Sequence, residues 1–350
     1  MGARAGVALL AAPALAMTVA ACASSSSNSS TSSSGSSAAA TGLQQQYENA
    51  VTSVLPSVVQ IFTSDATGSG VVYDSKGDII TNAHVVGSES TVQVVPATGG
   101  DTLTAKVLGT FPAGDLAVIR VESDASKLKV ATFGDSGNVK AGQIVLAMGN
   151  PLGLTGSVSQ GIVSALGRTV SATSSAGGNS PATTITDAIQ TTAAINGGNS
   201  GGALVNLNDQ VIGIPTAAAR DPEAGAAPGI GFAIPSNTAT SIAKQLIDTG
   251  RVTNSGRASL NITATTVATQ QGNEAGVGII SAANGGAAAS GGLQEGDVIV
   301  DVDGQQTPNV ATLNALLATL RPGQQVQVKY LRSGSSTVHS ATVTLGELAS

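Results

Sequence analysis

Short apolar runs rich in β-branched residues constrain the fold of this chain most strongly. They contain four to six residues, and Gly, Pro or Asp interrupts them before a helical period develops. Such runs predict strands, because β-branched side chains pack well on a pleated surface and turn residues end each strand. A first group comprises 57–62, 69–73, 91–95 and 116–121, and a second comprises 143–147, 161–166, 188–191, 210–214 and 231–234. Two successive groups predict a mainly β fold with two all-β units, either barrels or sandwiches.

A helix and a third unit follow the second group. Apolar residues recur at helical spacing between Ala239 and Ile247. Ser236 or Asn237 is the expected cap, and Gly250 lies just beyond the end. After a polar linker, the remaining residues predict a separate small α+β unit. Its strands are expected near 260–267, 277–281, 297–302, 325–331 and 337–345, with a helix near 311–320.

The N-terminal residues have the features of an export signal. Residues 5–21 form an apolar run behind Arg4, but these 17 residues are fewer than the roughly 20 that cross a bilayer. The run ends in the string Val-Ala-Ala-Cys, which resembles the lipobox of bacterial lipoproteins. We therefore expect residues 1–22 to be a lipoprotein signal and Cys22 to be lipidated, anchoring the protein to the cell membrane outside the cytoplasm. A plain secretory signal, which gives a secreted protein, and an uncleaved anchor are the alternatives.

A serine-rich segment follows the cysteine. Residues 23–42 contain 11 serines in 20 positions and almost no apolar residue other than alanine. Such a composition cannot bury enough surface to offset the entropy lost on ordering. We expect residues 23–46 to be a flexible tether and the folded part of the chain to begin near Tyr47.

The scarcity of reactive side chains excludes several kinds of site. One cysteine and two histidines cannot build a disulfide framework, a cysteine-cluster metal site or a three-histidine zinc site, so we expect no bound metal. The 15 Lys and Arg residues are scattered and the net charge is −6, which disfavours a nucleic-acid partner. The sequence has neither a G-x-x-x-x-G-K-[ST] loop nor a G-x-G-x-x-G fingerprint, so we expect no cofactor and no dependence on ATP.

Three short strings carry the residue types of a catalytic serine triad. They are Thr81–Val86, which contains His84, Gly114–Val118, which contains Asp115, and Gly198–Gly202, which contains Ser200. A serine hydroxyl needs a neighbouring imidazole to accept its proton, and a buried carboxylate orients that imidazole and stabilises its cation. The glycines around Ser200 permit a tight turn whose backbone N–H groups can stabilise a developing oxyanion. The order His, Asp, Ser, with the first two in one β unit and the third in the next, fits a cleft between two barrels.

Each of these residues has a less specific explanation when taken alone. A histidine between apolar residues is typical of a core, Asp115 fits a turn, and Gly-Asn-Ser-Gly-Gly is a common loop composition. The string around Ser200 also fits the G-x-S-x-G elbow of α/β-hydrolases, which would require His339 as the base. That elbow joins a strand to a helix, whereas strand-like residues follow Ser200, so the order His, Asp, Ser is favoured.

Taken together, these strings resemble the HtrA (DegP/DegS-like) family of trypsin-fold serine proteases. Further matching strings are 109–121, 149–153, 161–167, 193–206 and 229–237. The resemblance implies two six-stranded antiparallel β-barrels over residues 47–250, and residues 258–347 resemble the PDZ domain that follows the protease in that family.

The resemblance also implies roles for individual residues. His84 is the general base, Asp115 its orienting partner and Ser200 the nucleophile. Gly198, Asn199 and Ser200 form the oxyanion hole. The implied activity is that of an ATP-independent serine endopeptidase for unfolded or damaged extracytoplasmic proteins, assembled as a homotrimer. The competing interpretation is a PDZ-bearing chaperone or adaptor whose triad is latent or inactive.

Three positions depart from the family's usual pattern. The family commonly has Asp at the position of Thr192, Pro or Arg at that of Gly197, and Asn at that of Pro215. Gly197 is expected to loosen the oxyanion turn, and Pro215 removes a backbone donor from a segment near the substrate. A latent resting site is therefore a reasonable hypothesis.

Apolar residues predict the preference for the residue before the cleaved bond, P1. Ala194 and Ile195 precede Ser200 where trypsin-like enzymes place an acid, and Ile230 adds to the apolar wall. Since an unpaired cation is costly to bury there, we expect an S1 pocket that takes a small or medium aliphatic P1 residue.

The third unit has a candidate peptide-binding segment. Gly276, Val277, Gly278 and Ile279 resemble the part of a PDZ domain that binds a peptide C-terminus. The segment before Gly278 is expected to form the carboxylate loop. Residues 278–280 are expected to form an edge strand beside which the peptide adds as a further strand.

Overall fold

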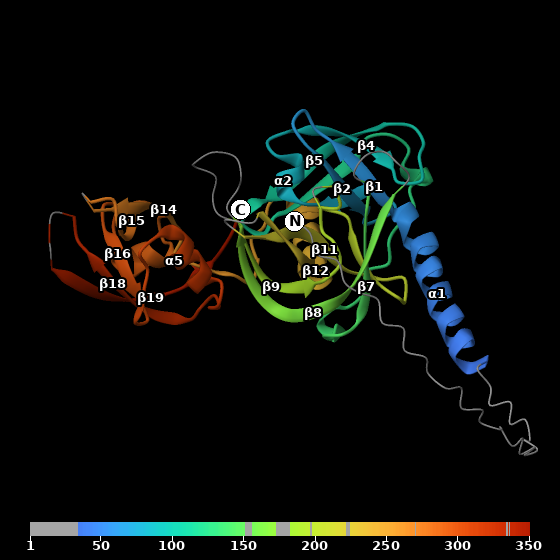
Figure 1. The fold of residues 1–350 in the computed structure, drawn as a ribbon. Helices are drawn as coiled ribbons and strands as arrows, with labels where there is room; N and C mark the ends of the chain where they lie inside the picture. The colour runs from blue at the N-terminus through green and yellow to red at the C-terminus, as the bar shows by residue number, and fades with distance from the viewer. Residues whose placement is uncertain are drawn as a thin grey trace, which may run out of the picture. The chain divides into compact units, whose positions relative to one another are not determined.

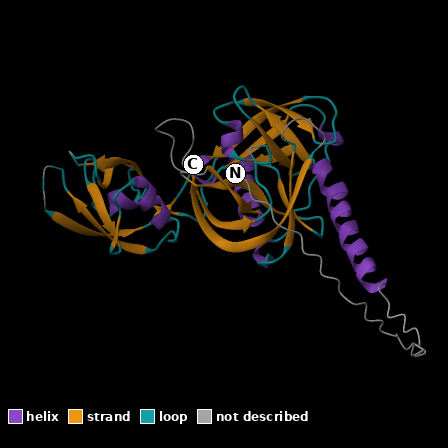
Figure 2. Cartoon of the chain, viewed as in Figure 1, coloured by secondary structure: helices purple, strands orange, loops and turns teal. Residues whose placement is uncertain are grey.

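The computed structural model describes residues 34–150, 156–172, 183–196, 198–221, 225–269, 271–333, 335 and 337–350. Strands dominate these residues, and most helices are short (Figure 2). Along the chain, two closed rings of six antiparallel strands precede an α+β unit with a sheet of its own (Figure 1). The predicted mainly β fold with two barrels is therefore confirmed. The expected signal at residues 1–22, with Cys22, lies outside the described residues.

The first barrel has the strand order β1-β2-β3-β6-β5-β4 and closes because β1 also pairs with β4. Its strands are β1 Val58–Phe62, β2 Thr67–Val72, β3 Asp78–Thr81, β4 Thr91–Pro96, β5 Leu103–Phe111 and β6 Leu116–Val121. The apolar runs predict four of these six strands. The other two give a weaker signal, because β3 has only four residues and Lys106 and Gly109 interrupt the apolar pattern of β5.

The second barrel has the order β10-β11-β12-β9-β8-β7 and closes through pairing of β10 with β7. Its strands are β7 Ile144–Gly149, β8 Ser157–Ala172, β9 Thr183–Thr191, β10 Ala203–Asn206, β11 Val211–Asp221 and β12 Gly225–Pro235. Five of them contain one of the predicted runs, and β10 comprises the strand-like residues that follow the glycines around Ser200.

Several strands are buried on both faces, which explains their continuous apolar runs. In β1, Val59 belongs to the core of the first barrel, whereas its neighbour Val58 belongs to the core shared between the barrels. Ile79 and Ile80 on β3 divide in the same way. Since successive side chains of a strand point to opposite faces, each such pair fills two cores at once. The residues that face the shared core bring the two barrels together, and the candidate catalytic strings lie along this contact.

Two longer helices accompany the barrels. Helix α3 (Ser236–Thr249) packs its apolar face on the shared core and ends at Gly250, whose φ of 72° suits glycine at a helix C-terminus. Its first flanking residue is Pro235 rather than the predicted Ser236 or Asn237. Helix α1 (Ser34–Val54) begins within the segment 23–46, for which the composition predicts a flexible tether. Good helix formers such as Ala and Gln in this part of the chain favour the helix.

The α+β unit has its own core and a twisted antiparallel sheet of order β14-β15-β16-β18-β19. Its strands are β14 Ile262–Ala268, β15 Glu274–Ala282, β16 Val298–Val302, β17 Gln305–Gln306, β18 Gln325–Leu331 and β19 Val338–Thr344, and β13 Ala258–Ser259 pairs separately with β20 Gly346–Glu347. Its helices are α4 Ala287–Ser290 and α5 Val310–Leu317.

The position of β15 corrects one sequence expectation. This strand contains Gly276 and Val277, which we expected in the carboxylate loop, and residues 278–280, which we expected at a free edge. Instead β15 pairs with β14 along its length and with β16 at Val277 and Gly278. The expected edge strand is therefore wrong, because a preceding strand covers that side of β15. The free edge on this side of the sheet belongs to β14.

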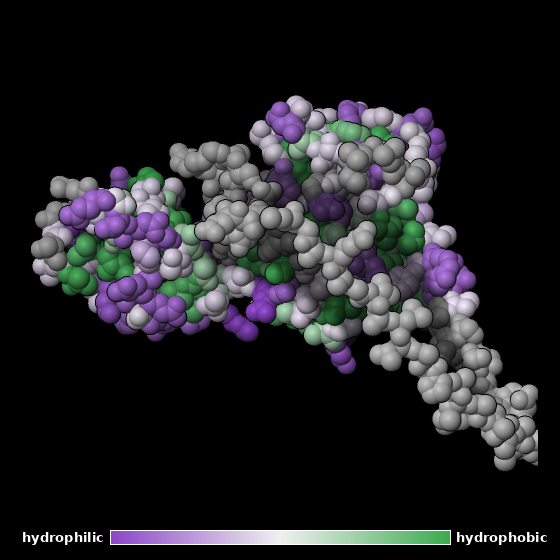
Figure 3. Space-filling model, in the orientation of Figure 1, coloured by the Kyte–Doolittle hydropathy of each residue, from purple (hydrophilic) through white to green (hydrophobic). Residues whose placement is uncertain are grey.

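The exposed surface is mixed in character. Hydrophilic and hydrophobic residues are interspersed over the coloured part of the visible face (Figure 3). Among the helices that the structure describes, none is both long and apolar enough to span a bilayer.

Candidate active site

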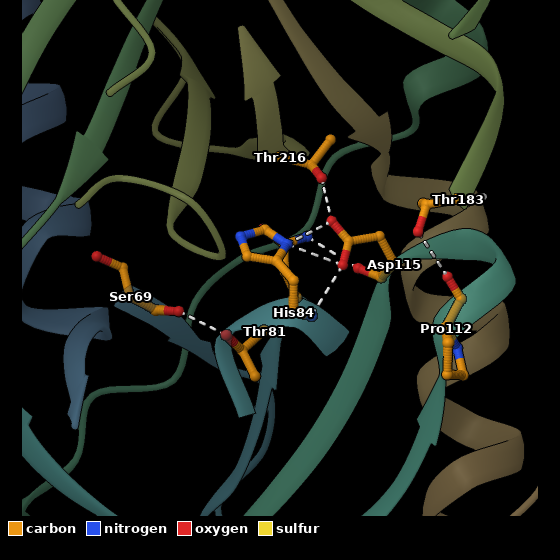
Figure 4. Close-up of polar contacts among 8 residues, drawn as sticks. Ser69, Thr81, His84, Pro112, Asp115, Thr183 and Thr216 are labelled. Atoms are coloured by element: carbon orange, nitrogen blue, oxygen red, sulfur yellow. Dashed lines mark hydrogen bonds and ion pairs between the residues drawn. The ribbon is translucent and has the colours of Figure 1, made fainter. Parts of the chain in front are cut away.

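Asp115 stands at a conformationally constrained point between a turn and strand β6. A short 3₁₀ turn, η2 (Pro112–Gly114), ends at Asp115, whose φ of 52° lies in the left-handed region that aspartate tolerates better than most residues. The backbone N–H of Asp115 donates to the carbonyl of Pro112 at 3.1 Å, and the hydroxyl of Thr183 donates to the same carbonyl at 3.2 Å (Figure 4). Asn82 donates from Nδ2 to the carbonyl of Asp115 at 2.9 Å. These bonds fix the backbone that directs the Asp115 carboxylate.

His84 lies on the one-turn helix α2 (Ala83–Val86), which follows β3. Its Nδ1 is 2.9 Å and 2.8 Å from the two carboxylate oxygens of Asp115, and its backbone N–H donates to Oδ1 at 3.0 Å. The Asp115 side chain is only 7% exposed, whereas that of His84 is 51% exposed. This geometry places the Nδ1 proton on the carboxylate side and leaves Nε2 available as a base (Figure 4).

The surroundings of His84 have opposing effects on its pKa. Burial disfavours the cation and lowers the pKa, whereas the hydrogen bond to Asp115 and the negative charge of that carboxylate raise it. The carboxylate outweighs burial, so the pKa of His84 lies above its ordinary value of 6.5.

Thr216 is a second residue bonded to the Asp115 carboxylate, and no sequence pattern points to it. Its hydroxyl donates to Oδ2 of Asp115 (Figure 4). A β-bulge in β11, between Pro215 and Ala217, marks the position of Thr216. Pro215 lacks an N–H, but its carbonyl accepts a hydrogen bond from the N–H of Gly201 at 2.9 Å. Two adjacent residues of the second barrel therefore contact both the carboxylate and the turn that carries Ser200.

The turn around Ser200 lies between β9 and β10 and packs tightly on the first barrel. Gly201 has a φ of 80°, and a Cβ atom there would lie 2.2 Å from the carbonyl oxygen of Ser69 and 2.4 Å from Oγ1 of Thr81. It would also lie 3.1 Å from the backbone N of Asn82, two residues before His84. Only glycine fits this position, because the backbone conformation and the space both exclude a side chain.

The side chain of Asn199 links the same turn to the residues that precede it. Its Nδ2 donates to the carbonyl of Ala194 at 2.9 Å, and its Oδ1 accepts from the N–H of Asn196 at 2.9 Å. Ser200 is 6% exposed. Within the part of the chain that the structure describes, Ser200 Oγ makes no hydrogen bond to His84. Such bonds are often long or absent in free enzymes and tighten when substrate binds.

The α/β-hydrolase alternative does not fit this geometry. Ser200 is followed by strand β10 rather than by the helix that a nucleophile elbow requires. His339 lies on β19 of the α+β unit, where its ring centroid is 5.6 Å from that of Tyr330. Among the described residues, no group of three or more His, Cys, Asp and Glu side chains could hold a metal ion.

Comparisons with known proteins agree with this geometry. The profile of the trypsin-like peptidase domain matches residues 68–214, and that of the PDZ domain matches residues 253–345. Serine protease PepD from Mycobacterium tuberculosis is 38% identical over 320 residues, which cover 86% of this chain and 66% of PepD. Serine protease Do-like HtrA from Bacillus subtilis is 37% identical over 310 residues, which cover 84% of this chain and 67% of that protein.

Solved structures show the same relationship. The HtrA-type protease AlgW, crystallised with a decapeptide, is 30% identical, with a TM-score of 0.55 over 86% of this chain and 98% of that one. The serine endoprotease from Yersinia pestis is 33% identical, with a TM-score of 0.54 over 86% of this chain and 98% of that one.

The chain belongs to the HtrA family of trypsin-like serine proteases. It spans about two thirds of the length of PepD and 57% of the Escherichia coli family member DegQ.

The three residues expected at the S1 pocket of this HtrA-family chain differ in exposure. Ile195 is 8% exposed and belongs to the core of the second barrel, whereas Ala194 and Ile230 are exposed. A Cβ atom on Gly231 would lie 2.4 Å from the side chain of Ile195, so the backbone of β12 passes directly over that side chain. Ile195 therefore acts as buried support beneath the segment before Ser200.

Thr192 and Pro215, two of the positions that depart from the HtrA-family pattern, are both accommodated in the second barrel. Thr192 exchanges hydrogen bonds with the backbone of Ile162, donating from its N–H and accepting at its hydroxyl, each at 3.0 Å. Pro215 keeps its place in β11 opposite Ala233. Gly197 lies outside the described residues.

The bond between His84 and Asp115 generates a testable prediction. NMR titration of the His84 ring should give a midpoint above 6.5, and Asp115→Asn should lower it, because burial then acts without the opposing negative charge. A His84 midpoint that Asp115→Asn leaves unaltered would show that the carboxylate does not stabilise the imidazolium in solution.

Proposed function

We propose that this chain is a serine endopeptidase that hydrolyses unfolded or damaged extracytoplasmic proteins through an acyl-enzyme. The observation that carries the proposal is the buried Asp115 carboxylate, bound to Nδ1 of His84 beside the glycine-lined turn of Ser200. Membership of a family of serine proteases supports the reaction class.

In this proposal each triad residue has one role. His84 accepts the proton of the Ser200 hydroxyl at Nε2 as Oγ attacks the scissile carbonyl, and the resulting imidazolium is stabilised by Asp115. The same imidazolium then protonates the leaving amine. Water attacks the acyl-enzyme with His84 again as the base, which releases the second product and restores Ser200. Because His84 must be neutral to act as a base, hydrolysis rises with pH through its raised pKa.

The backbone N–H groups of Gly198 and Ser200 are the proposed oxyanion donors. Neither N–H donates a hydrogen bond to another group among the described residues. Both are therefore available to bind the oxygen that becomes negative in the reaction. Asn199 lies between them, and its side chain supports the turn through Ala194 and Asn196 rather than facing the substrate.

The exposed Ala194 and Ile230 and the buried Ile195 support an aliphatic preference at P1. None of these side chains offers a charge to a Lys or Arg residue, so burying such a cation there would cost more than burying an aliphatic group. We infer a small or medium aliphatic P1 residue, with unfolded polypeptide as the substrate class.

We further infer that the α+β unit binds peptide C-termini along the free edge of β14. An added strand needs unpaired backbone groups, and β14 is the terminal strand of the sheet. Helix α5 contacts β14 and β15, and the N–H of Val310 donates to the hydroxyl of Thr266 on β14 at 3.2 Å. A peptide added to this edge would therefore lie beside α5. The related AlgW was crystallised with a decapeptide, which supports a peptide-binding role.

We also propose that Cys22 is lipidated and anchors the protein outside the cytoplasm. The support is the lipobox-like string that ends at this only cysteine, together with DegQ of Escherichia coli, which is named as periplasmic. An assembly of three copies stays a prediction from the family resemblance.

The nucleophile is tested by digestion of unfolded casein. Wild type should degrade it, and Ser200→Ala should lower kcat by about a millionfold, because the remaining groups cannot form an acyl-enzyme. If wild type degrades no unfolded protein even with C-terminal peptides added, the adaptor interpretation is correct instead.

The peptide site is tested by NMR with a decapeptide that ends in an aliphatic residue. With a free carboxylate, it should shift the amide signals of β14 and α5. The opposite edge strand β19 serves as the control and should not respond. The same peptide with a C-terminal amide should bind at least roughly tenfold more weakly, since backbone amides capture the carboxylate. Shifts concentrated in β19, or equal binding of both peptides, would contradict the assignment.

The anchor is tested by phase partitioning of the protein exported from a bacterial host. Wild type should enter the detergent phase, and Cys22→Ala should enter the aqueous phase because it lacks the acyl chains. Partition of wild type into water would favour the secreted alternative.

A further inference from the structure

Ser69 is a buried polar residue of the first barrel that the triad does not include. It lies on β2, is completely buried and sits directly against the turn that carries Ser200. Its hydroxyl, its backbone N–H and its carbonyl each form a hydrogen bond to a residue in or near the candidate active site. A buried polar residue that is satisfied in this way specifies one arrangement of its neighbours.

The Ser69 hydroxyl joins two segments of the second barrel. It donates to the carbonyl of Gly198 at 2.7 Å and accepts from the N–H of Asn150, just after β7, at 2.9 Å. A hydroxyl has one proton to donate, so the bond to Gly198 uses all of its donor capacity. Among the described residues, this is the only side chain of the first barrel that is hydrogen-bonded to residues 198–200.

The backbone of Ser69 holds the same turn from a second point. Its N–H donates to the carbonyl of Ser200 at 2.9 Å. Its own carbonyl accepts from the hydroxyl of Thr81 at 2.6 Å, which links it to the strand that leads to His84 (Figure 4). One residue therefore binds the carbonyl groups of both Gly198 and Ser200.

The residues packed around Ser69 include glycines, which have no side chain that could replace its hydrogen bonds to the turn. A Cβ atom on Gly149 would lie 3.0 Å from Ser69 Oγ and 2.5 Å from Cα of Asn199, and one on Gly201 would meet the Ser69 carbonyl. The turn is therefore flanked by glycines and closely packed. The N–H of Gly202 also donates to the carbonyl of Asn199 at 3.1 Å, whereas the bonds to the carbonyls of Gly198 and Ser200 come from Ser69.

We propose that Ser69 is a positioning residue that sets the aim of the oxyanion donors. The inference rests on the proposed function. Because peptide groups are planar, fixing the carbonyls of Gly198 and Ser200 fixes the planes of the peptides that follow them. The peptide that carries the N–H of Ser200 lies between those two planes, and its carbonyl, that of Asn199, accepts from the N–H of Gly202 at 3.1 Å. The bonds from Ser69 on both sides therefore limit the orientations open to this N–H. Donors that are aimed before the reaction stabilise the transition state without a reorganisation cost.

The test compares serine-to-alanine substitutions at two buried positions, Ser69 on β2 and Ser57 in the short 3₁₀ turn before β1. Ser69→Ala removes the hydroxyl that holds Gly198. Ser57→Ala is the matched control, because Ser57 is also buried and its hydroxyl has no hydrogen-bond partner among the described residues. Both are assayed with one aliphatic peptide substrate, after the active enzyme has been counted by complete labelling with a fluorophosphonate.

Ser69→Ala should lower kcat roughly 10- to 100-fold with KM changed less than about threefold, since the loss falls on the transition state. The inhibition constant of a peptide boronate, which mimics the tetrahedral intermediate, should rise by the same factor as kcat/KM falls. Ser57→Ala should match wild type in both kcat and boronate affinity. Ser69→Cys has a side chain of similar size and a weaker donor, so its kcat should lie between those of wild type and Ser69→Ala. This variant replaces Ser69→Ala in the test if the alanine variant does not fold.

The outcomes are distinct. If Ser69→Ala and Ser69→Cys retain the kcat and boronate affinity of Ser57→Ala, the hydroxyl does not position the donors and the inference is wrong. A fall in the labelled fraction alone, with kcat per labelled site unchanged, would show a purely structural role and would also overturn it. If wild type itself neither reacts with the fluorophosphonate nor cleaves peptide, the proposed function fails, and the role of Ser69 fails with it.

Discussion

The two barrels approach each other closely at the turn of Ser200, and the geometry of the site depends on that contact. At Gly201 even a methyl group would collide with the carbonyl of Ser69 and the hydroxyl of Thr81. The approach is possible because glycines line one side and a small serine lines the other. The shared core sets the contact, since strands such as β1 and β3 each contribute side chains both to their own barrel and to the barrel interface. Residues far apart in the sequence thereby come within hydrogen-bonding distance of one another.

Polar bonds across this interface connect the triad in both directions. From the second barrel, Thr216 reaches the Asp115 carboxylate, and the adjacent Pro215 holds Gly201 within its own barrel. From the first, Ser69 reaches the carbonyls of Gly198 and Ser200. The nucleophile turn and the carboxylate are thus supported by groups outside the triad. Because Thr216 and His84 both donate to Asp115, its buried charge is compensated by hydrogen bonds, which a buried carboxylate requires.

The sequence predicts a mainly β fold with two β units and a third unit because short β-branched runs report strand formation directly, and the family resemblance implies that the two β units are barrels. It also singles out His84, Asp115 and Ser200, since their residue types occur in strings with a known chemical logic. It does not reveal Thr216, whose position depends on a bulge in β11, nor Ser69, whose significance depends on the approach of the other barrel. The edge strand of the α+β unit was misplaced for a related reason. Local pattern identifies β15 as a strand, but only the pairing with β14 shows that it is covered.

The central claim is that these residues form a working site in which Ser200 is the nucleophile, activated by His84. Labelling with a fluorophosphonate followed by peptide mass mapping tests it most directly, because the reagent requires a serine whose proton is removed by a neighbouring base. The account predicts one modified residue, Ser200, in wild type, strongly slowed labelling in His84→Ala and none in Ser200→Ala. Equal labelling of wild type and Ser200→Ala, or no labelling of a folded wild-type protein, would contradict it.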